Sequence, residues 1–462
     1  MEKQEANAYL ASEPVGKLLR RFSLPCVLSM LVSALYNIVD QIFIGQGVGY
    51  LGNAATNVVY PFTVLALALA LLAGDGCAAL LSLSQGRGDA QGGHRSVGNG
   101  IVLIVIAGLA LTALGAVFRE PLLRLFGVTE ACYGYAREYY DVILIGIPFY
   151  AVASGLNAAI RADGSPGYSM FATILGAVLN LILDPVAIFV FDAGVRGAAI
   201  ATVIGQVASC EASIAYFRRP KSFALRRDSF RLRAGIVRRI AALGISSFII
   251  QTAIVVVMTV ANNIIVALGP ASRYGADIPL SVVGIVMKVF SIVIAISVGI
   301  SVGGQPIVGY NYGAGNHARV RQALRLILLA NIIVGALATL LFEFCPQAVI
   351  ALFGSESALY NEYAVLCFRI FLAGILLTCI QKASSIFLQA IGRPVKSTLL
   401  SLSRDVIFFI PGLFLFSAQG GVTGMLWAAP VADLLSALLA CILLYMEFRG
   451  QRKTMPEVMQ SA

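Results

Sequence analysis

Charge is scarce in this sequence. Only 12% of its 462 residues are Asp, Glu, Lys or Arg, against about 25% in a typical soluble domain. Histidine occurs twice and tryptophan once, and there is no HExxH motif, P-loop or Ser/His/Asp arrangement. These absences exclude a soluble globular protein and leave no sequence signal for an enzyme. No ATP-binding motif is present, so any pumping must draw on an ion gradient.

Other expected signals are missing too. The eight cysteines show no CxxC or Cys/His metal spacing, and most fall within or beside apolar runs, so we expect small buried hydrophobes and no cofactor. The first 21 residues are polar and lack the A-x-A pattern of a cleaved signal peptide. The apolar runs do not alternate with polar residues as membrane β-strands do. The first span should therefore serve as the insertion signal.

What the sequence has in abundance is long apolar runs. Hydrophobic residues make up 59% of the chain, and roughly 20 apolar residues suffice to cross a bilayer as a helix. The pattern predicts an all-α, multi-pass membrane protein with twelve transmembrane helices. The expected spans are 22–45, 54–82, 97–118, 139–159, 168–191, 197–217, 241–268, 279–304, 322–344, 363–386, 395–417 and 423–446.

The basic residues predict which side of the membrane each loop occupies. The terminal segments and the loops on their side hold 24 Lys and Arg residues, whereas the opposite loops hold five. We expect the protein to lie in the inner (plasma) membrane of the cell. By the positive-inside rule, both termini should then face the cytoplasm. The loop from Arg218 to Arg239 has nine basic residues and one acid, Asp228. Topology and contact with anionic lipid explain this charge, so we expect no nucleic-acid partner.

The two halves of the chain resemble each other. Gln85-Gly86-Arg87-Gly88-Asp89 has a counterpart in Tyr312-Gly313-Ala314-Gly315-Asn316, and Leu125-Phe126-Gly127 recurs as Leu352-Phe353-Gly354. Arg161–Pro166 likewise matches Gln389–Pro394, always with a shift of 225 to 228 residues. Six spans per half make the repeats parallel, and such proteins bind substrate in a central cavity. We expect an N-lobe (1–217), a basic linker (218–240), a C-lobe (241–446) and a cytoplasmic tail (447–462).

One span carries a carboxylate that a structural helix would avoid. Residues 168–191 include Asn180 and Asp184, four apart and so on one helical face, followed by Pro185, which should bend the helix. A carboxylate at mid-membrane costs about 2.5–3.5 kcal/mol even on insertion scales. We therefore expect Asp184 to bind a cation or a proton. The alternative is a carboxylate satisfied by neighbouring hydroxyls.

Further polar residues of the first half are able to complete an ion site. Asp40 lies in the first span, and Thr202 lies in the sixth. Together with Asn180 and Asp184 they predict an oxygen-lined pocket for Na+ or a shared proton. The alternative is a hydrogen-bonded network that only fastens helices, at about 0.6 kcal/mol per contact.

Other polar residues within spans have less certain roles. Candidates for a substrate cavity are Tyr36, Asn37, Gln206, Asn262 and Lys288. Asp75, between two glycines, is expected either to line that cavity or to cap a broken helix. Arg404 and Asp405 are adjacent, should point in different directions and so need other partners, for which Lys288 is one possibility. The role of Asp433 stays open.

Several segments carry a family resemblance. YNIVDQIFIG in the first span, RADGSP, LNLILDP with the following GVRGAAIATVIGQ, GGQPIVGYNYGAGNHARV and QAIGRPVKSTLLSLSRDVIFFIP resemble the multidrug and toxic compound extrusion (MATE) family, above all its prokaryotic DinF-like and MepA-like members. The resemblance covers essentially the whole chain. It implies a twelve-helix exporter with two six-helix lobes, which expels organic cations and other drugs in exchange for H+ or Na+.

The resemblance also implies site residues. The N-lobe cation site of the family matches Asp40, Asn180, Asp184 and Thr202 here. Family members often carry Asn where Ser154 stands, so a ligand or hydrogen-bond partner at that position is not carried over to this chain. Ser154 is a candidate for the substrate cavity. Another branch has acidic residues in helices seven and ten, where this chain offers Asn262 and Asn263 but no carboxylate. We therefore expect coupling in the N-lobe only. We also expect the protein to work as a monomer.

Two other classes of function remain as alternatives. A lipid-linked oligosaccharide flippase from a related superfamily tends to have extra spans and a more cationic cavity, and this chain has neither. An integral membrane transferase needs a catalytic cluster at a membrane face, and the sequence shows none. The substrate and the choice between H+ and Na+ stay undetermined.

Overall fold

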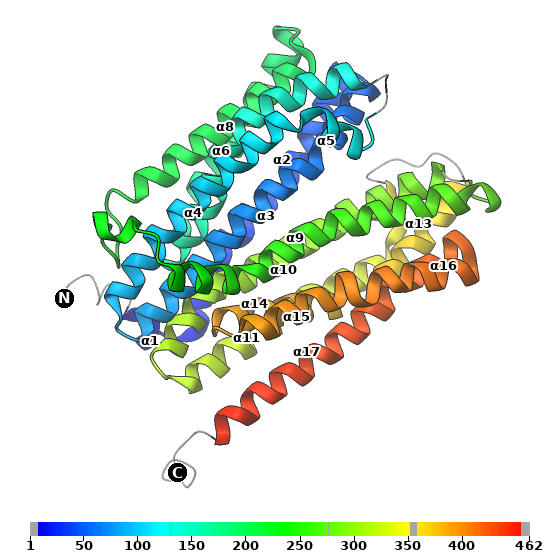
Figure 1. Cartoon of the computed structure of the whole chain (residues 1–462). Helices are drawn as coiled ribbons and strands as arrows, with labels where there is room; N and C mark the ends of the chain where they lie inside the picture. Colours follow the sequence, from blue (N-terminus) through cyan, green and yellow to red (C-terminus); the bar gives the residue numbers. More distant parts are fainter. Residues whose placement is uncertain (1–7, 129, 131, 276, 352–357, 454–462) are drawn as a thin grey trace. The chain divides into compact units, whose positions relative to one another are not determined.

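The computed structural model describes residues 8–128, 130, 132–275, 277–351 and 358–453, and these form helices and turns without a strand (Figure 1). Ten stretches are long and apolar enough to cross a bilayer, and a bent pair of helices makes an eleventh. The last stretch, Pro394–Arg449, holds two spans because Gly420 and Gly421 leave helical geometry between them. The predicted all-helical fold with twelve spans is confirmed.

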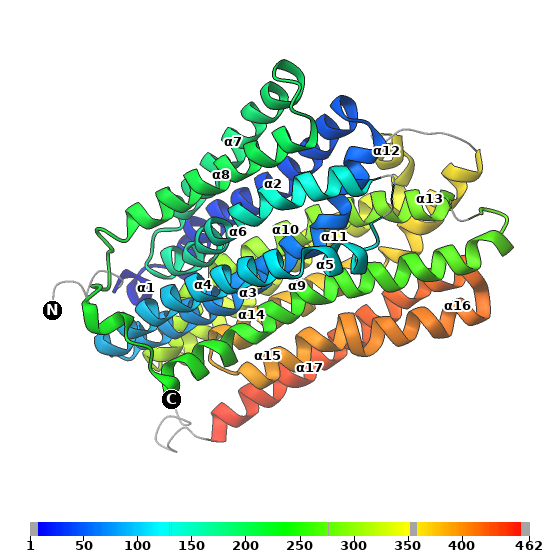
Figure 2. The same ribbon diagram turned by 45° about the horizontal axis from the view of Figure 1, so that its top comes forward.

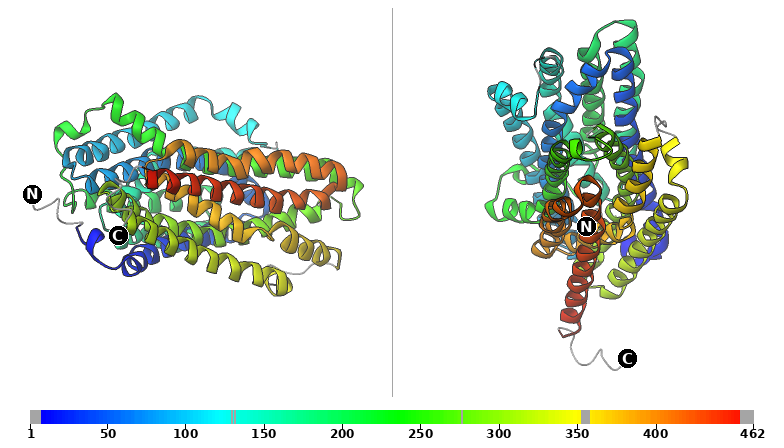
Figure 3. Two further views of the ribbon diagram at one scale, coloured as in Figure 1. Left: turned by 90° about the horizontal axis from the view of Figure 1, so that it is seen from below. Right: turned by 90° about the vertical axis from the view of Figure 1, so that its right-hand side faces the viewer.

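The spans keep the labels of Figure 1. They are α2 (Val15–Gly47), α3 (Tyr50–Gly86), α4 (Ala90–Val117), α6 (Tyr133–Ala162), α7 (Pro166–Pro185) continued by the π-helical η2 (Val186–Val190), α8 (Gly194–Tyr216), α9 (Ala234–Leu268), α10 (Asp277–Gly313), α11 (His317–Phe344), α13 (Ala358–Phe371) with α14 (Ile375–Ala390), α15 (Pro394–Leu402) with the π-helical η5 (Ser403–Phe409) and α16 (Ile410–Gly424), and α17 (Ala428–Lys453). After the break at Gly420 and Gly421, α17 runs back along α16 (Figure 3).

Short helices lie between the spans. They are α1 (Tyr9–Ser12), α5 (Arg119–Leu125), α12 (Pro346–Ala351) and the 3-10 turn η3 (Arg227–Phe230). Prolines lie inside five of the long helices that the structure describes, at Pro25, Pro61, Pro148, Pro185 and Pro306. Membrane helices tolerate them because neighbouring helices satisfy the freed backbone groups.

The helices pack into two compact units. The first comprises Met1–Val255, Val298–Ile327 and Gln389–Pro394, and the second comprises Val256–Ser297, Leu328–Leu388 and Val395–Ala462. The packing units therefore divide α9 and α10, whereas the predicted lobes follow the repeat in the sequence. The division into lobes at 218–240 stays a prediction.

Glycines set the helix spacing in the first unit. α3 and α6 pack on each other, and α6, α7 and α8 lie side by side (Figure 2). A Cβ added to Gly74 of α3 would lie 2.6 Å from the carbonyl oxygen of Gly155 in α6. Interfaces of small residues let backbones approach closely where water is absent. The apolar core that results includes Phe62, Leu111 and Tyr140.

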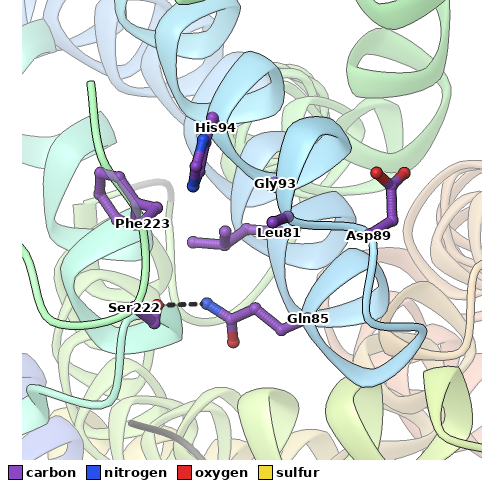
Figure 4. A pocket seen from close by; sticks show the side chains of 8 residues that line it. Leu81, Gln85, Asp89, Gly93, His94, Ser222 and Phe223 are labelled. Carbon is purple, nitrogen blue, oxygen red and sulfur yellow. Dashed lines mark hydrogen bonds between the residues drawn. The ribbon is translucent and has the colours of Figure 1, made fainter. Parts of the chain in front are cut away.

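The linker is fastened to the first unit by hydrogen bonds. The buried Asn99 of α4 donates to the carbonyl oxygens of Ser229 and Arg231, both at 3.0 Å, and accepts from the amide of Arg233 at 2.9 Å. At the other end of the linker, Ser222 accepts a hydrogen bond from Gln85, beside a small pocket (Figure 4). We call the side of the membrane that carries residues 218–233 the linker side.

Turns at repeat-related positions have the same geometry. Gly88 and Gly315 have φ of 72° and 76°, and Gly164 and Gly392 have φ of 82° and 74°. The residues that follow Gly88 and Gly315 make equivalent backbone hydrogen bonds. The amide of Asp89 donates to the carbonyl of Ser84, and the amide of Asn316 donates to the carbonyl of Asn311. Left-handed backbone of this kind favours glycine. The repeat seen in the sequence is thus a structural repeat; the matched residues Leu352–Gly354 lie outside the described part of the chain.

Candidate ion-coupling site

The site is built on one face of α7. Gly176, Asn180 and Asp184 follow one another at intervals of four residues, so their side chains lie on the same face. Gly176 meets Gly205 of α8, where a Cβ would lie 2.6 Å from the Gly205 carbonyl oxygen. This close approach brings Thr202, one turn away on α8, to Asn180.

Four predicted residues come together at this point. The Asn180 amide donates to Oδ1 of Asp184 at 3.1 Å and to Oγ1 of Thr202 at 3.2 Å. Asp40 of α2 lies beside Asp184, close enough for the two carboxyl groups to interact. Asp184 is fully buried, and Oδ2 of Asp184 and Oδ1 of Asp40 are buried oxygens without a donor.

Tyrosines surround the two carboxyl groups. Tyr36, one turn before Asp40 on α2, interacts electrostatically with both carboxyls, and so does Tyr139 of α6. Tyr60 and Tyr150 adjoin Tyr36. Sequence reasoning identified Tyr36 but missed the other three, because tyrosines at the ends of spans are also typical of the membrane interface.

Pro185 changes the helix type next to the site. Beyond it the chain forms the π-helical turn η2, in which the amide of Phe191 donates to the carbonyl of Val186, five residues earlier, at 3.1 Å. Ile188 of this turn packs against Gly47 at the end of α2. Single π turns are frequent at functional sites, and this one links the end of α7 to the helix that carries Asp40.

The other predicted cavity residues have varied surroundings. Asn37 is exposed and donates to the carbonyl of Ser33 at 2.6 Å, within its own helix. Gln206 packs against Gly146 of α6, and its Oε1 is buried without a donor. Ser154 is half-buried and lies beside Tyr150. Asn262 and Lys288 belong to the second unit, where Asn262 is exposed and Lys288 is half-buried.

Asp75 does not cap a broken helix. α3 runs without interruption from Tyr50 to Gly86, and Asp75 is buried within it. Its carboxylate accepts a hydrogen bond from Ser247 of α9 at 2.8 Å and lies 3.6 Å from the guanidinium of Arg161. That alternative from the sequence is therefore wrong, because the flanking glycines serve helix contacts and do not break the helix.

The charges of the second unit pair differently from what we predicted. Arg404 binds Asp433 at 2.8 Å and also its own neighbour Asp405 at 2.7 Å, while Asp405 binds Lys382 at 2.8 Å. The expectation that Arg404 and Asp405 point apart is wrong. Both residues lie in the π-helical η5, which alters side-chain directions relative to an α-helix. In the described part of the chain, Lys382 is the partner of Asp405 in the place suggested for Lys288.

The two halves thus differ in the chemistry of their buried charge. In the second unit two cations balance two anions. In the first unit Asp40 and Asp184 face tyrosines and an amide, with no basic side chain among their interacting neighbours in the described residues. Two carboxylates in a low dielectric cannot both stay ionised without a cation between them. The arrangement is therefore able to hold a proton or a small cation among oxygen atoms. No group of three or more His, Cys, Asp or Glu residues with metal-site geometry occurs among the residues searched.

Comparison with known proteins agrees with a membrane transporter of twelve helices. The MatE family model matches residues 25–186 and 248–415, once in each half, and the chain belongs to this family of transporters. The multidrug export protein MepA of Staphylococcus aureus (strain N315) is 25% identical over 445 residues, and MepA of Staphylococcus saprophyticus is 25% identical over 453 residues. In both cases 96% of each chain is covered.

Solved structures share the fold. A MATE protein crystallised in complex with MaL6 superimposes with a TM-score of 0.88 at 23% identity, over 96% of this chain and 99% of that one. A MOP superfamily transporter from Pyrococcus furiosus has a TM-score of 0.88 at 24% identity, over 96% and 98%. The predicted family, the helical fold and the assignment to transporters, not enzymes, are confirmed.

Proposed function

We propose that this protein is a secondary active exporter of drug-like organic cations, which it exchanges for inward H+ or Na+ by alternating access. The observation that carries the proposal is the pair Asp40 and Asp184, whose buried oxygens lack donors beside Asn180 and Thr202. The names of the MepA relatives, which are multidrug export proteins, support the same substrate class.

The carboxyl pair gives a physical reason for coupling. An ion bound between Asp40 and Asp184 neutralises their repulsion and changes the hydrogen bonds that Asn180 makes to Asp184 and Thr202. The π turn after Pro185 joins this face of α7 to α2, so ion binding biases the local packing of these helices. Each ligand must bind the two transport states with different affinity, or its flux does not couple to the other. With 1:1 exchange, a tenfold ion gradient supplies about 1.4 kcal/mol, enough for about tenfold substrate accumulation.

The test is counterflow of a fluorescent organic cation in proteoliposomes. Asp40→Asn and Asp184→Asn should each abolish gradient-driven transport, because the remaining carboxylate no longer needs a shared ion. Asp192→Asn is the matched control: the same change at an exposed carboxylate close by in the chain, with φ of 50°, a conformation that Asn tolerates. Normal coupled transport in either buried variant removes that carboxylate from the mechanism.

Separate gradients identify the ion. Dye efflux is measured with a pH gradient alone and with a Na+ gradient alone, in wild type and in both variants. We expect one gradient to drive efflux in the wild type and neither to do so in the variants. A plasma-membrane location with cytoplasmic termini follows from the positive-inside pattern, and labelling of terminal tags from either side of intact cells tests it. Whether each chain works alone stays a prediction.

A further inference from the structure

Two glycines join α3 to the first part of α9 on the linker side. A Cβ added to Gly76 of α3 would lie 2.1 Å from the carbonyl oxygen of Ile240 in α9. A Cβ added to Gly244 of α9 would lie 1.8 Å from the carbonyl oxygen of Leu72 in α3. Both distances are far below van der Waals contact, so only glycine permits this crossing.

A second crossing joins α3 to the end of α10. A Cβ on Gly86 would lie 1.9 Å from the carbonyl oxygen of Tyr310, and one on Gly313 would lie 2.3 Å from that of Leu83. Gly86 and Gly313 are counterparts in the repeated sequence, as are Leu83 and Tyr310, with a shift of 227 residues. In this contact, a segment of the first repeat therefore packs against the equivalent segment of the second repeat.

The same relation holds for the flanking helices. Gly299 and Gly303 of α10 lie close to the backbone of α2. A Cβ added to Gly299 would lie 2.7 Å from the Cα of Val27, and one added to Gly303 would lie 2.5 Å from the Cα of Ser23. These contacts mirror those of Leu72 and Gly76 of α3 with α9. Spans from the first and second halves of the sequence thus meet pairwise along the linker-side parts of α3 and α10.

Polar side chains fill the space between these crossings. Asp75 accepts from Ser247 of α9, and Gln389 at the end of α14 donates to Ser247 Oγ at 3.2 Å and to the carbonyl of Leu243 at 2.6 Å. Gln305 of α10 reaches Gln389 at 3.5 Å. The hydrogen bonds thus link α3, α9, α10 and α14, and the other Asp75 oxygen accepts no hydrogen bond but lies 3.6 Å from the Arg161 guanidinium.

A permanent helix interface gains little from burying a carboxylate and amides in this way, about 0.6 kcal/mol per hydrogen bond. A contact that separates and re-forms benefits from such groups, because its polar side chains regain water when it opens. The narrow glycine crossings also leave little apolar surface to expose when the helices separate. We propose that this linker-side set, formed by the glycine crossings with Asp75, Ser247 and Gln389, closes the transport path on the linker side and comes apart once in each transport cycle. Asp75 is then a positioning residue of the closed state. The inference rests on the alternating access proposed above.

The test uses glycine substitutions that prevent closure. Gly86→Ala places a methyl group against the Tyr310 carbonyl, and overpacking of this kind should shift the equilibrium about 5- to 150-fold toward the linker-side open state. The readout is labelling of a reporter, Ser82→Cys, by a membrane-impermeant maleimide in a background without the native cysteines. Ser82 is 1% exposed and adjoins Gly309 of α10, so it should react only in the open state.

Two matched variants and one control complete the design. Gly313→Ala, the repeat counterpart, should raise labelling to a similar extent. Gln389→Ala removes hydrogen bonds without adding volume and should shift labelling in the same direction, which covers the case that a glycine variant does not fold. Gly284→Ala lies in the same helix as Gly313 with nothing within 4 Å of the added Cβ, and should change labelling less than about twofold.

The outcomes separate this inference from the exporter proposal. Increased labelling with lost transport in the glycine variants supports the closing contact. Labelling at the control rate in a folded Gly86→Ala and in Gln389→Ala overturns it, even where Asp40→Asn still abolishes coupling. Conversely, normal transport in the Asp40 and Asp184 variants leaves the labelling result standing and removes only the ion-coupling mechanism.

Discussion

Replacing Asp405 by asparagine should destabilise the fold by about 3–5 kcal/mol, because it breaks a buried charge pair and leaves the opposite charge uncompensated. Among the described residues Asp405 alone forms an ion pair with Lys382, at 2.8 Å, and it shares Arg404 with Asp433. Lys382, Asp405 and Asp433 are all buried, with side chains at most 7% exposed. The variant therefore holds two cations against one anion away from water.

A second substitution should restore much of this loss. In Lys382→Met/Asp405→Asn the remaining pair, Arg404 and Asp433, is neutral, and methionine fills nearly the same volume as the lysine stem. Lys382→Met alone leaves an excess anion and should also be costly. We expect the double variant to be more stable than the sum of the single effects predicts by about 2–3 kcal/mol, at the upper end for contacting residues.

The assay is reversible unfolding in mixed micelles with increasing SDS, followed by circular dichroism, for the four members of the cycle. The pair Glu13 and Lys17, 3.1 Å apart with side chains 27% and 64% exposed, provides a control cycle with an expected coupling of about 0.2–1 kcal/mol. Additive effects at Lys382 and Asp405, no larger than in the control cycle, would refute the reasoning that these charges neutralise each other within the protein.

Three further predictions concern the first unit. Gly205→Val should separate α7 from α8, because a Cβ there lies 2.5 Å from the Gly176 carbonyl; transport and thermal stability should both fall, and Gly167→Ala, with open space around it, should change neither. Asn99→Ala removes three hydrogen bonds that hold the linker, so limited proteolysis within 218–233 should accelerate while transport by uncut protein persists; an unchanged cleavage rate contradicts the anchoring role. Burial raises the pKa of Asp163 although Ser222, Tyr216 and the amide of Lys221 donate to it, so the folded protein binds this proton more tightly than the unfolded chain. That contribution to stability is complete below about pH 4 and is lost as the pH rises through the raised pKa. The melting temperature of the wild type, relative to that of Asp163→Asn, should therefore fall as the pH rises from about 4. A relative melting temperature that increases with pH contradicts the raised pKa.

Much of the architecture could be predicted from the sequence because the bilayer imposes it. The twelve apolar runs and the linker follow from hydropathy and charge alone, and the repeat follows from motifs that match between the two halves. The meeting of Asp40, Asn180, Asp184 and Thr202 followed in part from the four-residue spacing on α7 and in part from the family resemblance. Their role in coupling remains a prediction.

The remainder depends on local geometry that residue patterns do not encode. Arg404 and Asp405 pair because η5 is π-helical, and nothing in SLSRDVIFF distinguishes this from an α-helix. Tyr139 reaches the carboxyl pair, and Tyr150 reaches Tyr36, only because α6 packs where it does. The assignment of the first part of α9 to the first unit depends on the crossing at Gly76 and Gly244, and a glycine in a span has many other uses.

Gly86 and Gly313 touch although they occupy equivalent positions of the repeat. Two equivalent positions can meet only at the axis that relates them, so this axis passes between the two glycines. A probe or inhibitor that binds at these two glycines therefore contacts both halves of the repeat at once. One that binds at Asp184 contacts a pair of buried carboxyl groups that only the first half possesses.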